Sequence, residues 1–150
     1  MMTKLDSKNY DERQMIDRYK ISFETMLLTF VLIFISGMIN IFHGPWAAGN
    51  TQMMILLSIP TSYFAVRVVL KRAYFSVRQK SYAVSLILFG ATGLLNLGNF
   101  VLDLMNGGSI IENGVLSEDL FSFFLALPFI LIPAAYFILK QTDKNNAEDD

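Results

Sequence analysis

The residues that could do chemistry inside this sequence are the amides and the carboxylate of the segment NLGNFVLD, residues 96–103. They lie within a hydrophobic stretch, and steps of four and three residues extend them into a row on one side of a helix. The row comprises Ser85, Phe89, Thr92, Asn96, Asn99, Asp103 and Asn106, all polar except Phe89. In hydrocarbon such side chains need a hydrogen-bond partner or water, so we expect the row to face inward.

A shorter polar row lies in the first hydrophobic segment, at Ser36, Asn40 and His43. Three interpretations compete for the two rows: hydrogen bonds that hold helices together, a strip that contacts a partner's helix or a second copy, or a cleft that receives a ligand or ion. The candidate residues of this polar stripe are Ser36, Asn40, Thr92, Asn96, Asn99 and Asp103.

The elements that must position these residues are four hydrophobic segments, at about 21–42, 52–70, 82–102 and 120–139. Each is close to the ~20 residues that a helix needs to cross a bilayer, and the chain is 53% hydrophobic and only 17% charged. The predicted fold is all-α: a single domain of 150 residues, an integral membrane four-helix up-down bundle. The tails 1–8 and 141–150 are predicted to be flexible.

The distribution of positive charge predicts the orientation. All 12 Lys and Arg residues fall in the N-terminal tail, around the connection between the second and third spans, and in the C-terminal tail. The other two loops contain none. By the positive-inside rule both termini are cytoplasmic, which predicts a multi-pass protein of the cell membrane with the lipid bilayer as its first partner.

Residues near the ends of the spans have predicted roles as well. A short amphipathic cytoplasmic helix leads into the first span, and its apolar face of Met15, Ile16 and Tyr19 either rests on the membrane surface or docks a cytoplasmic partner. Trp46, the single Trp, is expected to be an interfacial anchor.

Two further contacts are predicted from depth and turn signals. Glu24 and Arg67 lie at matching depth near the cytoplasmic side, so we expect an ion pair there, unless Arg67 extends its charge to the interface. The pair Asn113-Gly114 indicates a hairpin in the outer loop 104–118. Since isolated hairpins are marginal, the sequence does not decide whether that loop is ordered.

The first half of the chain, residues 11–75, resembles a family of small uncharacterised membrane proteins of Gram-positive bacteria. The resemblance rests on the run DERQMIDRYKISFE, on Trp46, and on the second-span ending YFAVRVVLKRAYF, which contains Tyr63 and Arg67. The resemblance implies the same membrane topology as in the members of this family. Their domain has no known function, so the resemblance implies no activity and no catalytic residues.

The residue inventory does not favour an enzyme. One His, no Cys and scattered acids make neither a catalytic cluster nor a zinc site, and no P-loop is present, so we expect no catalytic residues, no metal and no cofactor. The basic loop KRAYFSVRQKS is explained by topology and lipid contact rather than nucleic acid.

The preferred function is an accessory or regulatory subunit that packs against another membrane protein or against itself. The alternative is a small-molecule or ion transporter or sensor with an outward-facing polar cleft between spans one and three. The sequence identifies neither partner nor ligand, oligomeric state or physiological process.

Overall fold

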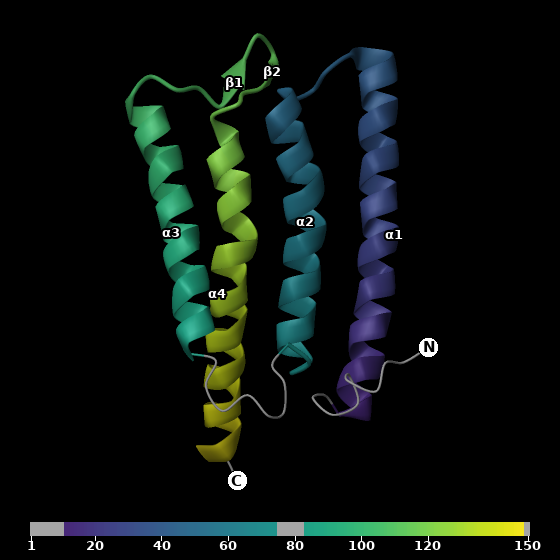
Figure 1. Cartoon of the computed structure of the whole chain (residues 1–150), viewed down its shortest axis with the longest axis vertical. Helices are drawn as coiled ribbons and strands as arrows, with labels where there is room; N and C mark the ends of the chain where they lie inside the picture. The colour runs from purple at the N-terminus through teal and green to yellow at the C-terminus, as the bar shows by residue number, and fades with distance from the viewer. Residues whose placement is uncertain (1–10, 75–82, 149–150) are drawn as a thin grey trace.

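The computed structural model describes residues 11–74 and 83–148 and is built from four long α-helices and one β-hairpin (Figure 1). The elements in chain order are α1 (Glu12–His43), α2 (Gly49–Leu70), α3 (Ala83–Met105), β1 (Ile111–Glu112), β2 (Val115–Leu116) and α4 (Leu120–Glu148). Each helix is long and apolar enough to cross a membrane. The all-α prediction with four span-length helices is therefore confirmed.

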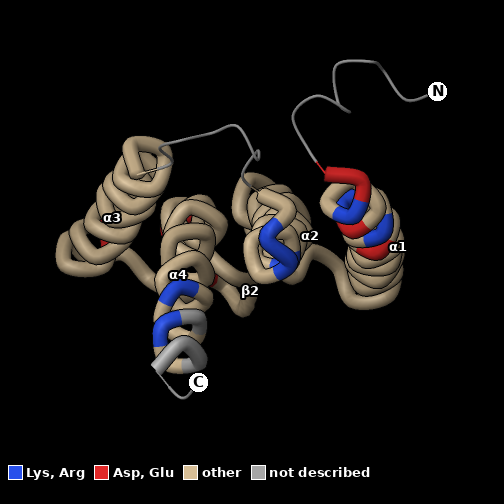
Figure 2. Tube along the Cα trace, turned by 90° about the horizontal axis from the view of Figure 1, so that it is seen from below, with Lys and Arg blue, Asp and Glu red and all other residues tan. Residues whose placement is uncertain are grey.

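The four helices lie side by side in one layer, in the order α1, α2, α4, α3 (Figures 1 and 2). The helix interfaces follow this order, α1 with α2, α2 with α4, and α4 with α3. The prediction of a bundle that encloses the polar rows of the first and third spans is wrong, because α2 and α4 separate α1 from α3. Ala65 of α2 lies in one buried cluster with Ile132 and Ala135 of α4, so α4 takes the place next to α2.

The core of the layer joins α2, α3 and α4. Its buried residues are Ala65, Val69, Leu86, Ile132 and Ala135. Two buried serines, Ser58 and Ser62, share a helix face with Ala65, at the spacing of small residues that lets transmembrane helices approach closely. On α3, Gly93 serves the same purpose, because a Cβ atom there would lie 2.6 Å from the Ile130 side chain of α4.

The ends of α1 and α4 differ from the predicted boundaries. The side chain of Asp11 caps α1 in a capping box with Gln14, and the helix then runs without interruption into the first span. The predicted cytoplasmic helix and first span are thus one continuous helix. At the other terminus α4 reaches Glu148, so most of the predicted tail 141–150 is helical. The predicted tail 1–8 lies outside the described residues.

The outer loop forms the hairpin indicated by Asn113-Gly114. β1 pairs antiparallel with β2, and Asn113 and Gly114 have φ of 51° and 82°, the left-handed values that a two-residue turn requires. The hairpin is joined to the connection between α1 and α2: the Leu116 amide donates to the Trp46 carbonyl at 3.1 Å, and the Ala48 amide donates to the Leu116 carbonyl at 2.8 Å. Residues 104–118 are therefore an ordered part of the fold.

Charge is distributed unevenly along the layer. The described Lys and Arg residues lie toward the end where α1 begins and where α2 and α4 end (Figure 2). We call this the basic end, and the end that carries the hairpin the hairpin end. No Lys or Arg occurs in the segments 44–50 and 104–119 that form the connections at the hairpin end.

Candidate functional site

One polar cluster joins α1 to α2 near the basic end. A single carboxylate oxygen of Glu24 accepts hydrogen bonds from the Tyr63 hydroxyl at 2.8 Å and from the Arg67 guanidinium at 3.1 Å. The guanidinium carbon also lies 5.7 Å from the centre of the Tyr63 ring, within cation–π range. The predicted ion pair of Glu24 and Arg67 is confirmed. Tyr63 is its third member, and its position one turn before Arg67 was the available sequence signal.

This cluster joins two helices and is only partly covered by the rest of the protein. The Arg67 and Glu24 side chains are 42% and 30% exposed, so both retain contact with the surroundings of the layer. The Arg67 Nε atom is buried and has no hydrogen-bond partner among the described residues. The ion pair therefore acts first as a structural contact between α1 and α2.

A second polar cluster joins the same two helices near the hairpin end. The hydroxyl oxygen of Ser36, which is 4% exposed, accepts hydrogen bonds from the Trp46 indole at 3.0 Å and from the Gln52 amide at 2.7 Å. Trp46, predicted as an interfacial anchor, thus uses its N–H within the protein. Gln52 was missed by the sequence interpretation, although a Gln in the first turn of a hydrophobic segment was a signal for it.

Between the two clusters the interface of α1 and α2 is not closely packed. An open pocket of about 230 Å³ is lined by residues of both helices, among them Thr25, Thr29, Pro60 and Phe64. The hydroxyls of Thr25 and Thr29 donate to carbonyls four residues earlier in α1. These threonines therefore satisfy themselves within their own helix and add no bond between helices.

The polar row of α3 does not meet the row of α1. Ser36 faces α2, and Asn40 is exposed. Thr92 and Asn96 are half-buried, and the Asn96 amide donates to the Thr92 carbonyl of its own helix at 2.9 Å. The predicted cleft between the first and third spans is not formed in this arrangement.

Asn99 and Asp103 are the members of the stripe that the fold leaves open. Both are exposed on α3, which is the last helix of the layer on its side (Figure 2). We call these two residues the α3 edge. Sequence periodicity placed them on one face of a helix, but it did not indicate that this helix would stand at the border of a layer.

The predicted docking face near the start of α1 is divided by the fold. Met15 is 9% exposed, whereas Ile16 and Tyr19 are 61% and 60% exposed. The two exposed residues continue the outward-facing row of Phe23 and Phe30 because the helix is continuous. Met15 therefore belongs to the interior, and a docking surface that uses all three residues is not present.

Within residues 11–74 and 83–148, no three His, Cys, Asp or Glu side chains gather closely enough to hold a metal ion.

The carboxylate of Asp119 forms a hydrogen bond with the loop that contains the hairpin, since it accepts the Ser109 amide at 2.9 Å. Ser117 belongs to the hairpin as well, because its hydroxyl donates to the Ser109 carbonyl and its carbonyl accepts the Thr51 hydroxyl at 2.7 Å.

Comparisons of the chain with protein-family models, with curated proteins and with solved structures found no match. The resemblance of residues 11–75 to a family of Gram-positive membrane proteins therefore stays a prediction.

Proposed function

We propose that this chain crosses the cell membrane four times in alternating directions, with both termini in the cytoplasm, and acts as an accessory or regulatory subunit. In this role it packs against another membrane protein, or against a second copy, through the α3 edge. The observation that carries the proposal is that Asn99 and Asp103 are exposed at the border of a single layer of helices.

The argument starts from the depth of Asn99. It lies about five residues beyond the middle of α3, or about 7.5 Å along the axis, inside the ~15 Å half-thickness of the hydrocarbon. An amide there lacks water, and a hydrogen bond from a neighbouring helix is worth about 0.6–2 kcal/mol. Asp103 lies about 13 Å from the middle, close to the interface. A partner helix that bonds to Asn99 would remove the cost of exposing the amide to lipid.

The proposed orientation is supported by the charge distribution. The basic end contains the start of α1 and the ends of α2 and α4, which the positive-inside rule assigns to the cytoplasm. The hairpin end would then face outward. Because the chain has no Cys, single Cys residues at Lys71 and Glu112 can report this directly. A membrane-impermeant maleimide added to intact cells should label Glu112→Cys and spare Lys71→Cys; the reverse pattern would contradict the orientation.

An interaction role is favoured over transport by the position of the polar residues. A transport cleft between the first and third spans needs the rows of α1 and α3 to face each other, and here α2 and α4 lie between them (Figure 2). The open amide and carboxylate instead lie where another helix has access. We assign the chain no reaction.

The test is native mass spectrometry of the protein extracted gently from its own membranes. We expect a complex of fixed stoichiometry, with another protein or with a second copy, which Asn99→Leu disrupts. The matched control is Asn40→Leu, since Asn40 is an exposed amide on α1 at the opposite border. A monomeric wild-type protein, or a complex that survives Asn99→Leu unchanged, would overturn the proposal.

A further inference from the structure

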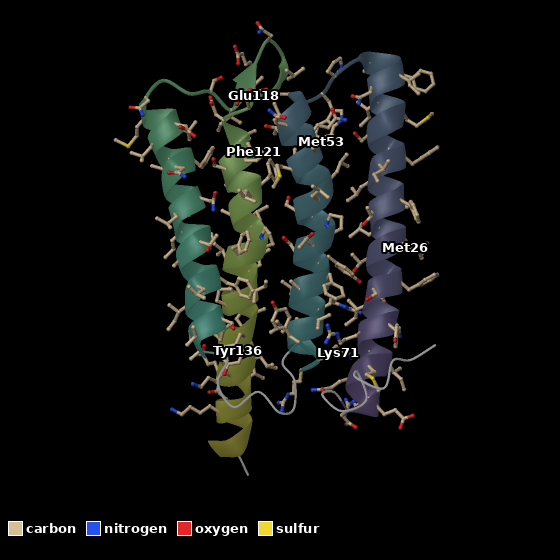
Figure 3. All side chains as sticks on the ribbon, viewed as in Figure 1. Met26, Met53, Lys71, Glu118, Phe121 and Tyr136 are labelled. Carbon is tan, nitrogen blue, oxygen red and sulfur yellow. The ribbon has the colours of Figure 1, made fainter. Side chains whose placement is uncertain are left out.

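A long groove runs between α3 and α4 at the basic end. Its volume is about 730 Å³, and its lining includes Gly90, Ala91 and Leu94 of α3 and Pro133, Tyr136 and Lys140 of α4. Tyr136 lies where the first turns of α3 run beside α4 (Figure 3).

The groove exists because the two helices pack closely at one level and carry small side chains at the next. Near mid-helix, Gly93 contacts Ile130, and the rings of Phe89 and Phe129 lie 6.0 Å apart. Next to this contact the lining of α3 mixes the small Gly90 and Ala91 with larger residues such as Leu86. A Cβ atom at Gly90 would meet nothing within 4 Å. The space is thus bounded by close packing on the side toward mid-helix.

The chemistry of the lining is apolar with one cation. Among the described residues that line the groove, Lys140 is the only charged one, and its side chain is exposed. It is the lining residue nearest the C-terminal end of α4, which lies at the basic end. An elongated apolar space that ends at an ammonium group is complementary to a molecule with a hydrocarbon tail and an anionic head.

We propose that this groove binds an anionic phospholipid of the cytoplasmic leaflet, with one acyl chain between α3 and α4 and the phosphate at Lys140. Basic pockets between transmembrane helices on the cytoplasmic side bind anionic head groups in this way. Burial of the chain against Leu94 and Pro133 supplies apolar contact, and Lys140 selects the charge of the head group. A zwitterionic lipid would enter the same groove without the net attraction to Lys140.

This inference rests on the proposed membrane placement but is independent of the contact at the α3 edge. Gly90 and Asn99 are nine residues apart, and at about 100° per residue they fall on opposite sides of α3. A lipid in the groove and a partner helix at Asn99 can therefore be present together, and either can be lost without the other.

The experiment measures lipid binding by native mass spectrometry of the purified full chain in detergent. Phosphatidylglycerol and phosphatidylcholine with identical acyl chains are titrated separately. We expect one phosphatidylglycerol to bind more tightly than phosphatidylcholine. Lys140→Gln should weaken phosphatidylglycerol binding about fivefold and leave phosphatidylcholine binding unchanged, as one lysine near an anionic head group contributes about that much. Lys71→Gln is the matched control, since Lys71 is exposed at the basic end, directly after α2, and lies outside the groove lining (Figure 3).

A second pair of variants tests the apolar part of the groove. Gly90→Leu should fill the space and weaken binding of both lipids. Gly98→Leu should leave both unchanged, because Gly98 also has open space around it but is not part of the lining. Equal affinity of the wild type for both lipids, or equal effects of Lys140→Gln and Lys71→Gln, would overturn the proposal, as would unchanged binding in Gly90→Leu. The same spectra show the oligomeric state, so failure at the α3 edge is seen separately.

Discussion

Helix α2 contacts α1 on one side through hydrogen bonds near its two ends and one small apolar cluster. It contacts α4 on the other side through small and apolar side chains. On the α1 side, Glu24 and Ser36 each accept two hydrogen bonds, and an open pocket lies between the two polar clusters. Ile21 adds a small buried cluster with Val68 and Ala73. On the α4 side, the buried residues of α2, α3 and α4 form a continuous core. The two interfaces of one helix are thus stabilised by different interactions.

In the proposed membrane placement, the comparison illustrates how helices associate when lipid surrounds them. Lipid tails are as apolar as leucine, so burial alone gives little, and close packing or hydrogen bonds must provide the rest. The α2–α4–α3 unit uses close packing, which is spread over many atoms. The α1 interface combines one small apolar cluster, Ile21 with Val68 and Ala73, with a few polar groups. Because each of those polar groups joins α1 to α2 directly, single substitutions there should loosen α1 selectively.

The largest expected loss of stability follows from disrupting the close packing of α3 against α4. Gly93→Leu should destabilise the protein by about 2–3 kcal/mol, because the new side chain would begin 2.6 Å from Ile130 Cγ1 and 3.1 Å from the Ile130 backbone nitrogen. Thermal unfolding in detergent, followed by circular dichroism, measures the change. Gly98→Leu on the same helix is the control, and an equal midpoint for the two variants would show that the close contact is unimportant.

A smaller and more local effect is expected at the ion-pair cluster. Glu24→Ala removes the acceptor of both Tyr63 and Arg67, and we expect a loss of about 1–2 kcal/mol, since the partly exposed pair contributes less than a buried one. Hydrogen exchange should rise in α1 and stay unchanged in α4. Tyr63→Phe, which removes only one of the two bonds, should show part of this effect. Faster exchange in α4 as well would mean that the two interfaces are not separable.

The smallest changes in stability are expected for two buried serines. Ser36 belongs to the α1–α2 interface, and Ser58 lies on the face of α2 that carries Ala65. Ser36→Ala leaves the Trp46 and Gln52 donors without their acceptor and should cost about 1 kcal/mol. Ser58→Ala should be neutral or slightly stabilising, because the buried Ser58 hydroxyl has no partner among the described residues. Unfolding midpoints compare the two, and fluorescence of the single Trp reports Ser36→Ala directly. Equal costs for the two substitutions would contradict the difference between the interfaces.

Much of the fold follows from the sequence because its signals are local. Segment length and apolarity predicted four helices, Asn113-Gly114 predicted the hairpin, and equal depth from the same membrane side predicted the pair of Glu24 and Arg67. Each of these signals depends on residues close in the chain or on distance from a membrane boundary.

The order of the helices in the layer could not be predicted in the same way. Apolar residues surround most of the circumference of α1, so hydropathy does not indicate which side meets α2. The polar rows suggested that α1 and α3 face each other, yet Ser36 bonds to Gln52 and Asn96 bonds to its own helix. A polar side chain in a span needs a partner, and its type does not say which partner it finds.

The bonds between the hairpin and the connection of α1 to α2 have a consequence for synthesis. They join Trp46 and Ala48 to Leu116, a residue that leaves the ribosome only after all of α3. A nascent chain that contains α1, α2 and α3 therefore still lacks the strand that joins its two halves. The bonds at this end can therefore form only after α3 has been made, and because Leu116 precedes α4 in the chain they do not require α4 to be complete.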